Sequence, residues 1–400
     1  MKSLKAIGAL IAAAAAVAVV PAPGAVAQTV KVGIINTYSG PFAEPGDLID
    51  RGIKLYMKQH EKDLPAGVKI ELIRRDDTGP QPDVAKRMAQ ELITRDQVQF
   101  LAGFVYTPNA MAVAPLATEA KVPLIVMNAG TAAITTTSPY IARVSFTMWQ
   151  SSYPLGQWAA KHDIKTAYTA VSDYAPGADA EEAFIKGFTE AGGQIVGSVR
   201  IPLQNPDFTP YLQKAKDSKP AALFVFVPAG TQAIAVMKAF GDVGLKQAGI
   251  KLIGPGDITP DEELPNMGDF AVGTITMFHY SAAADRPANK AFVAAWKRAY
   301  GADTNPNFNA VQVWDGMQAI FDAIRAQKGK MSGEKTMEAL KGWKFDSPRG
   351  PIMIDPETRD IVQNEYLRRL EKVDGKLANV EIEVFATQVK DPWKILNNKR

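Results

Sequence analysis

Short apolar runs alternate with amphipathic stretches of helical length along most of this chain. The runs are rich in Val, Ile, Leu and Phe and lie at residues 30–35, 68–74, 100–103, 124–127, 166–171, 194–201, 222–227, 251–253 and 274–278. The amphipathic stretches include residues 47–61, 82–95, 107–119, 178–191, 208–216, 231–243 and 289–300. This order is typical of βαβ units, which build parallel sheets with helices on both faces. It predicts an α/β protein with doubly wound parallel sheets, and a length of 400 residues favours two such lobes.

Loops rich in small and hydroxyl-bearing residues follow the predicted strands. In open sheets of this kind, ligands bind beyond the carboxyl ends of the strands, where loops lead into helix N-termini. Free backbone amides and hydroxyls at such places suit a carboxylate or another hydrogen-bond acceptor. The loop after residue 127 contains Ala129, Gly130 and Thr131, and Thr107 stands at a predicted helix N-cap after the neighbouring strand. For each threonine the alternative is a purely local role, in a cap or in a turn.

Aromatic residues occur in the same group of loops. Tyr106, Trp149 and Tyr174 are candidates for a ligand site, because a large ring with a polar edge suits a cleft that is partly apolar. The alternative for each ring is packing in the core or at its rim.

The usual motifs of catalysis are missing from the sequence. The chain has three histidines and no cysteine, which leaves little material for a metal centre built from those residues. It has no Gly-x-Ser-x-Gly elbow and no phosphate loop, and "GPGDIT" at residue 254 lacks the third glycine of a dinucleotide fingerprint. The formal net charge is only +3, so no nucleic-acid partner is expected. These observations predict a protein that is not an enzyme and that carries no cofactor and no metal.

The amino-terminal residues 1–27 have the features of a secretory signal peptide. Lys2 and Lys5 precede an apolar core rich in alanine, which ends in Ala25-Val26-Ala27 before a strand-like segment. A membrane anchor is the alternative, but the apolar run is short and Pro21 and Pro23 end it. Cleavage after Ala27 would leave 43 basic and 42 acidic residues, a net charge of +1. We therefore expect a secreted chain, and a periplasmic location agrees with this expectation.

Several segments, in this order along the chain, resemble the leucine/isoleucine/valine-binding proteins of bacterial ABC importers, which are type I periplasmic binding proteins. They are "VKVGIINTYSGPFA", "RDDTGPQPDVAKRMAQELI", "LAGFVYTPNAMAVAPLA", "VPLIVMNAG", "DYAPGADAEEAFIKGF" and "FVAAWKRAYG". The resemblance implies two doubly wound lobes joined by three crossover strands, with residues 28–147 and 281–347 in lobe 1 and residues 148–280 and 348–400 in lobe 2. It also implies a monomer that traps a small carboxylate-bearing solute by hinge closure and delivers it to a membrane permease.

The same resemblance assigns roles to particular residues. Thr107 takes the place of a family serine, and Ala129 and Thr131 take the places of a backbone and a hydroxyl contact, all three to the α-carboxylate of the ligand. Tyr174 lies near a family tyrosine that covers the ligand from the second lobe, and Trp149 lies near the first crossover.

Departures from the family pattern leave the solute open. Family amino-acid binders place an acid that grips the α-ammonium where this chain has Gly256, and Asp257 is one residue further on. An unpaired buried ammonium is costly, so the pocket suits an amino acid only if Asp257 reaches the ligand. A second-lobe aromatic residue is replaced by Ala229. A branched-chain amino acid is the main expectation, and an aromatic acid or an amide is the alternative. An exported enzyme and a sensor module are other classes that the sequence supports less.

Overall fold

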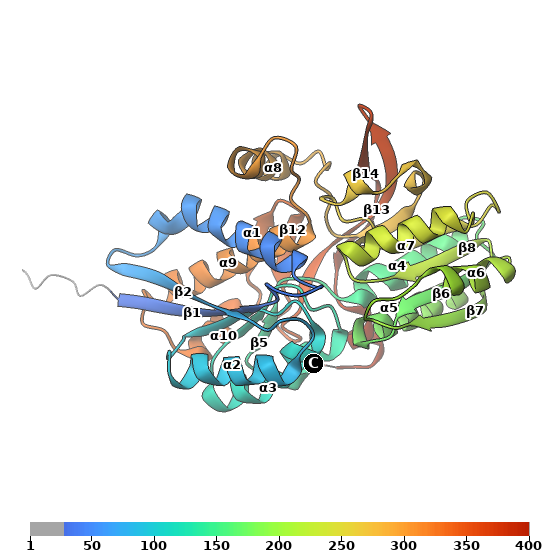
Figure 1. The fold of residues 1–400 in the computed structure, drawn as a ribbon. Coiled ribbons are helices and arrows are strands. Elements are labelled where there is room, and N and C mark those ends of the chain that lie inside the picture. The colour runs from blue at the N-terminus through green and yellow to red at the C-terminus, as the bar shows by residue number, and fades with distance from the viewer. Residues whose placement is uncertain (1–27, 400) are drawn as a thin grey trace, which may run out of the picture.

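The computed structural model describes residues 28–399, and its first sheet consists of five parallel strands (Figure 1). The strands lie in the order β2-β1-β3-β4-β5. Their bounds are β1 Gln28–Asn36, β2 Val68–Asp76, β3 Phe100–Gly103, β4 Leu124–Val126 and β5 Ile141–Arg143. This order reverses direction between β1 and β3, and the carboxyl ends of two such strands form the crevice where open α/β sheets bind ligands.

The second sheet repeats this topology. Its parallel part has the order β7-β6-β8-β9-β10, with the direction reversed between β6 and β8. The bounds are β6 Thr166–Ser172, β7 Gln194–Ile201, β8 Ala222–Phe226, β9 Lys251–Pro255 and β10 Ile275–Phe278. The second ligand-binding crevice expected from topology is therefore at the ends of β6 and β8.

An antiparallel extension follows β10 in the second sheet. The strand β13 (Ile361–Val373) pairs with β10 and forms a long hairpin with β14 (Lys376–Val389), which projects from the body of the molecule in Figure 1. Two short strands, β11 (Lys344–Ser347) and β12 (Gly350–Ile354), complete the sheet beside β13. Neither this extension nor β5 was predicted from the sequence.

Helices flank both sheets, as the alternating pattern predicts. The first group comprises α1 Glu44–His60, α2 Pro82–Thr94, α3 Thr107–Ala120, α8 Pro287–Tyr300, α9 Phe308–Ala326 and α10 Gly333–Leu340. The second comprises α4 Met148–Lys161, α5 Ala175–Glu190, α6 Thr209–Asp217 and α7 Thr231–Asp242, and α11 Pro392–Leu396 packs on α4. Of these, α4, α9, α10 and α11 were not among the predicted helices. Within residues 28–399, none of the helices combines the length and apolar character that a membrane span requires.

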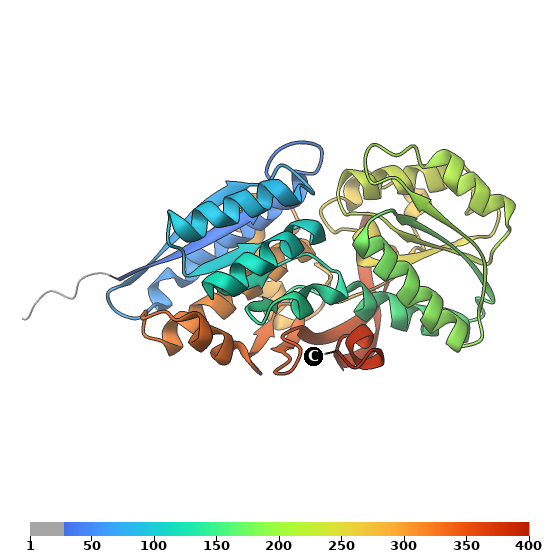
Figure 2. The ribbon, with the colours of Figure 1, turned by 90° about the horizontal axis from the view of Figure 1, so that it is seen from below.

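The chain passes three times between the two lobes. It leaves the first sheet after β5 to enter α4, returns after β10 to enter α8, and crosses again between α10 and β13. Figure 2 shows the two lobes side by side with the carboxyl-terminal strands between them. The predicted class, two α/β lobes with crossover connections, is confirmed. The predicted signal peptide lies outside the described residues.

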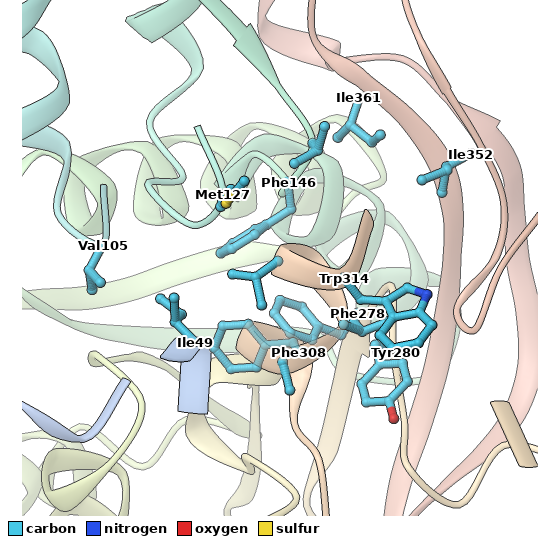
Figure 3. Close-up of a cluster of buried hydrophobic side chains, with 14 of the residues drawn as sticks. Ile49, Val105, Met127, Phe146, Phe278, Tyr280, Phe308, Trp314, Ile352 and Ile361 are labelled. Atoms are coloured by element: carbon cyan, nitrogen blue, oxygen red, sulfur yellow. The ribbon is translucent and has the colours of Figure 1, made fainter. Parts of the chain in front are cut away.

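Aromatic rings pack where these crossings meet. The ring of Phe146 lies edge-on to those of Phe278 and Phe308, with ring centroids 5.3 and 6.0 Å apart, and Phe278 is 5.0 Å from Phe308 (Figure 3). All three residues are buried. They come from the segment after β5, from β10 and from the start of α9. One tightly packed aromatic cluster therefore connects the segments near which the chain crosses between the lobes, which we call the junction.

Candidate ligand-binding site

A small cavity lies between the carboxyl ends of the two sheets. The space open to the centre of a water molecule is about 30 Å³, and the unfilled space around it, open solvent included, is about 430 Å³. The lining residues come from the first sheet, the second sheet and the junction; they are Pro45, Val105, Tyr106, Thr107, Asn128, Gly130, Phe146, Met148, Tyr174, Pro176, Phe226, Pro228, Ala229, Asp257, Phe308 and Asn309. Five of the eight residues predicted to bind a ligand, namely Tyr106, Thr107, Gly130, Tyr174 and Asp257, are in this lining.

A sharp backbone turn after β3 brings Tyr106 and Thr107 to the cavity. Gly103 has φ +104° and Phe104 has φ +65°, and a Cβ at Gly103 would meet Asn36 Oδ1 and Ile35 O at 2.6 Å. Only glycine fits such a close approach at positive φ. The bulky Phe104 adopts a left-handed conformation that costs free energy, and strain of this kind is often found at binding sites.

Thr107 does not cap its helix, so that prediction is wrong by one residue. Tyr106 occupies the N-cap in an extended conformation, and no side chain caps α3. The hydroxyl of Thr107 instead lies 3.0 Å from that of Thr131, which likewise makes no capping bond in its own turn. The local roles that compete with ligand binding are therefore not taken up by either hydroxyl.

Backbone amides beside these hydroxyls remain available as donors. In residues 28–399, no hydrogen bond engages the N–H groups of Thr107, Gly130 or Thr131. Ala129 differs, because its N–H donates to Phe104 O at 3.0 Å. The first wall thus presents one hydroxyl that lines the cavity and several amides, the groups that hold an anion without a cationic side chain.

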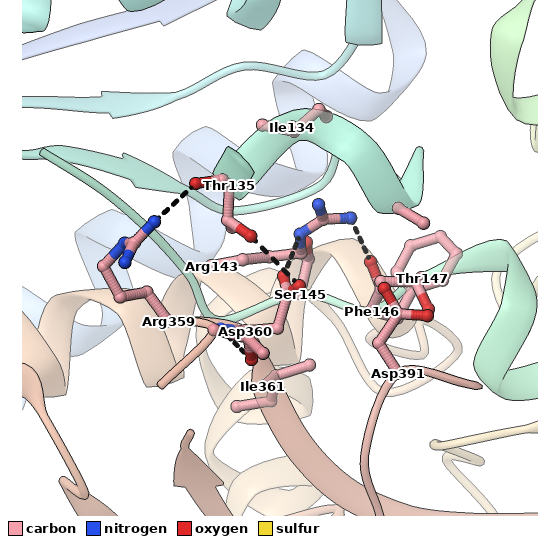
Figure 4. Close-up of polar contacts among 12 residues, drawn as sticks. Ile134, Thr135, Arg143, Ser145, Phe146, Thr147, Arg359, Asp360, Ile361 and Asp391 are labelled. Atoms are coloured by element: carbon pink, nitrogen blue, oxygen red, sulfur yellow. Dashed lines mark hydrogen bonds and ion pairs between the residues drawn. The ribbon is translucent and has the colours of Figure 1, made fainter. Parts of the chain in front are cut away.

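A buried guanidinium fixes the loop that carries these amides. Arg143 donates to the carbonyls of Thr131 (2.7 Å) and Ala129 (3.3 Å) and pairs with Asp360 at 2.8 Å, as Figure 4 shows in part. Lys394 from the carboxyl-terminal helix bonds Ala132 O at 3.0 Å and pairs with Asp360. The carbonyls of Ala129 and Thr131 accept hydrogen bonds from Arg143. These bonds hold the loop in place and leave the N–H groups of Gly130 and Thr131 available as donors.

The second wall carries rings and one acid. Tyr174 precedes α5 and stacks on Phe226 with centroids 6.1 Å apart, and burial raises the pKa of Tyr174 well above its usual range. Asp257 follows β9, is only 6 % exposed, and its Oδ2 atom has no hydrogen-bond partner in the described part of the chain. Burial raises the pKa of Asp257 to about 7, and the charge of Arg368 partly opposes this.

Trp149 and Thr131 stand outside the lining. The ring of Trp149 is buried against Ala132 and Ala183 and stacks on Tyr153 with centroids 6.3 Å apart. Its position near the first crossover agrees with the sequence, but the structure gives it a packing environment away from the cavity. Thr131 and Ala129 support the lining from behind through Thr107 and Arg143.

Junction residues complete the cavity and were not predicted. Phe146, Met148 and Phe308 supply apolar surface, and Asn128 and Asn309 supply amide side chains whose Oδ1 atoms have no partner within residues 28–399. Asn307 caps α9 by accepting bonds from the amides of Asn309 and Ala310, which places Phe308 and Asn309 at the helix start. The "NPNFN" sequence is the one available signal, because asparagine before an apolar run is typical of a helix start.

One contact closes the rim between the lobes. The Glu44 carboxyl, at the start of α1, lies against Gly230 at the N-terminus of α7, where a Cβ would be 2.3 Å from its Oε2 atom. Gly230 has φ +91°, so glycine is required there both for conformation and for space. Burial and, after it, the neighbouring Glu263 raise the pKa of Glu44 to about 8.

Two lobes of repeated topology with an enclosed, partly polar cavity between them define a two-lobed binding protein for a small molecule. The chain belongs to the periplasmic binding protein family, whose model matches residues 29–376. It is a solute-binding protein of the ABC-transporter type. That family consists of binding proteins and not of enzymes.

Comparisons with individual proteins agree with this membership. The "Leu/Ile/Val-binding protein homolog 6" of Brucella melitensis is 44% identical over 92% of this chain and 94% of its own length. A solute binding protein from Rhodopseudomonas palustris BisB5, in complex with 3,4-dihydroxy benzoic acid, is 54% identical with a TM-score of 0.88, over 92% of this chain and 99% of that one. A second from R. palustris HaA2, in complex with p-hydroxybenzoic acid, is 45% identical with a TM-score of 0.87, over 90% and 98% of the two chains.

Proposed function

We propose that this protein captures an aromatic carboxylic acid in the periplasm and delivers it to an ABC permease. The observation that carries the proposal is the division of the cavity into a hydroxyl-and-amide side and a ring-lined side. A flat ring with one carboxylate matches that division. The relatives crystallised with hydroxybenzoic acids, at 45–54% identity, support the same class of ligand.

The ligand's carboxylate would lie at the first wall. Thr107 Oγ1 donates to it there, together with the free amide of Gly130. No lysine, arginine or histidine lines the cavity in the described structure, so the anion is held by dipoles, which avoids the desolvation of an opposing charge. The ring would then pack among Tyr106, Phe146, Tyr174, Phe226 and Phe308.

Closure of the lobes completes the site in this proposal. Residues 28–147 with 281–347 form one moving body and residues 148–280 with 348–400 the other, joined at the three crossings. A ligand bound to the first wall gains the contacts of Tyr174 and Phe226 only in the closed state, so it shifts the population toward closure. The permease would recognise that closed shape. Residues 1–27 would serve as a cleaved signal peptide, and the mature protein would act as a monomer.

A binding screen tests the proposed ligand class. The mature chain would be titrated calorimetrically with benzoate, 3- and 4-hydroxybenzoate, 3,4-dihydroxybenzoate, leucine and isoleucine. We expect dissociation constants in the micromolar range or below, about −8 kcal/mol or better, for at least one aromatic acid. Binding of leucine or isoleucine without any aromatic acid would reject the aromatic class.

A branched-chain amino acid is the second candidate. Asp257 favours it, because a buried carboxyl without a partner could pair with an α-ammonium. The Leu/Ile/Val-binding homologue at 44% identity supports the same reading. The screen above separates the two candidates directly.

A further inference from the structure

Three side chains of the cavity lining, Asn128, Asn309 and Asp257, have a buried oxygen without a partner within residues 28–399, and Asp257 is the acid among them. It lines the cavity from the second sheet, its exposed fraction is 6 %, and its Oδ2 atom makes no hydrogen bond in the described structure. Buried polar atoms without partners are rare in native proteins and call for an explanation. Among the lining residues, Asp257 is also the single carboxyl group.

The surroundings of Asp257 argue for a donor from the ligand. Behind it, Arg368 is occupied with the carbonyls of Gly256 and Tyr280 and with the hydroxyls of Thr276 and Thr259. No hydrogen bond joins this guanidinium to the Asp257 carboxyl. Asp257 lines the cavity, so a group bound in the cavity can supply an N–H or O–H to this carboxyl.

The ligand's own charge decides which end meets Asp257. Two carboxylates close together in a buried cavity repel one another, so the ligand's carboxylate turns away from Asp257 and toward Thr107. The distal edge of the ring then faces the acid. Thus, resting on the proposed function, we infer that Asp257 accepts a hydrogen bond from a ring hydroxyl and makes the protein selective for hydroxylated aromatic acids over benzoate.

Either protonation state of Asp257 can serve this role. An ionised carboxyl accepts at both oxygens, and a protonated carboxyl still accepts at its carbonyl oxygen. An aromatic acid without the hydroxyl would leave Oδ2 buried and unpaired, which sites of this kind penalise strongly. Selectivity therefore comes from a penalty on benzoate as well as from a bond to the hydroxylated acid.

A four-ligand titration of the unaltered protein is the first part of the test. The ligands are 4-hydroxybenzoate, 3-hydroxybenzoate, benzoate and 4-methylbenzoate, and calorimetry gives each affinity. At least one hydroxylated acid should bind tenfold or more tightly than benzoate. 4-Methylbenzoate fills almost the volume of 4-hydroxybenzoate but offers no donor, so weak binding of the methyl compound excludes size as the cause. Equal affinities for all four would overturn the inference while leaving the aromatic class intact.

Variants at position 257 are the second part. Asp257→Leu should lose the preference for the hydroxylated acid and keep binding of benzoate, whereas Asp257→Asn should retain most of the preference because its amide oxygen still accepts. Asp261→Asn is the matched control: Asp261 is also buried beside Arg368, but it bonds Asn379 and the amide of Ala282 and lies outside the lining. The control should leave the preference unchanged.

If Asp257→Leu keeps the preference, the inference is wrong. If Asp257→Leu does not fold, the methyl comparison on the unaltered protein decides. If no aromatic acid binds but leucine does, the proposed function itself has failed.

Discussion

The two walls of the cavity share a sheet topology but differ in chemistry. Each lies at the point where strand order reverses, between β1 and β3 in one lobe and between β6 and β8 in the other. Each is also supported by a buried arginine that bonds loop carbonyls, Arg143 in the first wall and Arg368 in the second. Yet the first wall presents free amides and a hydroxyl, and the second presents rings and an acid.

This difference shows how one topology can hold the two ends of one ligand. The repeated scaffold decides where the loops meet, and the loop residues decide which chemical group each wall accepts. The first wall favours an anion and the second favours an apolar ring with a donor at its edge. Substitutions in one wall at a time therefore test whether the two walls act independently.

Loss of Arg143 should have the largest effect. In Arg143→Met, three loop carbonyls lose their donor and Asp360 loses one of its two cationic partners. Breaking a buried ion pair costs about 3–5 kcal/mol of folding free energy. Unfolding by denaturant should show this loss, and titration should show weak binding of every aromatic acid, because the loop amides are no longer held in place.

The matched change on the other wall is Arg368→Met. It should reduce folding stability by a similar amount but leave the first-wall loop intact. Benzoate, which needs only the anion site and the rings, should then still bind. Equal loss of benzoate binding in both variants would mean that the two walls are not independent.

Thr107→Val should weaken binding by about ten- to hundredfold. The substitution keeps the shape and removes one hydrogen bond to a charged group, which is worth about 1.5–3 kcal/mol. Thr131→Val should have a smaller effect, because Thr131 acts through the Thr107 hydroxyl at 3.0 Å and does not itself line the cavity. Calorimetry measures both. Thr136→Val, an exposed threonine of the same loop, is the control. A larger loss for Thr131 than for Thr107 would reverse the assignment.

The sequence predicted the scaffold and the first wall better than the second. The alternating pattern and the loop residues Thr107, Gly130 and Thr131 are local signals, because a strand end and the loop after it are contiguous in the chain. The cavity also depends on Phe146, Phe308 and Asn309, which meet only because the chain crosses between lobes three times. Such contacts carry no short-range signal. Trp149 shows the converse, since it is near the crossover in sequence but packs in a cluster outside the lining.

The carboxyl-terminal strands show a further limit. The strand β13 carries the buried charged residues Glu365 and Arg368 among its apolar positions, so its pattern resembles neither an exposed strand nor a buried one. Arg368 is buried because its donors bond groups from β10 and from the turn after β9. That compensation is visible only in the fold.

The pH dependence of binding should report the charge of the ligand that shares the cavity with Asp257. Burial raises its pKa to about 7, Tyr106 and Tyr174 in the same lining have raised pKa values and stay neutral, and Arg368 behind it stays charged. A bound carboxylate raises this pKa further, so binding takes up protons near pH 7. Affinity should then fall as pH rises through 7, by at most about tenfold per pH unit.

Calorimetry at pH 7 in buffers of different ionisation enthalpy measures this proton uptake. Asp257→Asn should remove the part of the uptake that belongs to Asp257 and leave the part that belongs to Glu44 at the rim. An amino acid would reverse the Asp257 part, because its ammonium lowers the pKa of Asp257. More proton uptake by Asp257→Asn than by the unaltered protein would therefore contradict an aromatic acid as ligand.

The rim contact of Glu44 should give the smallest effect, a several-fold change in affinity that depends on pH. Its pKa is raised to about 8 by burial and by Glu263 where the two lobes meet at this rim, and separation of the lobes would return it toward the ordinary value near 4.5. Closure therefore takes up a proton at Glu44. The stabilisation of the closed state by this proton is complete below about pH 4.5 and is lost as pH rises through 8.

Glu44→Gln mimics the protonated form, so binding of a hydroxybenzoate by this variant should weaken less between pH 6 and pH 9 than in the unaltered protein. Asp47→Asn, three residues along α1 and exposed, is the control. Glu44 lies between the walls and outside the lining. The ratio of affinities for hydroxybenzoate and benzoate should therefore stay the same in Glu44→Gln. A change in that ratio would show that the rim and the second wall are coupled.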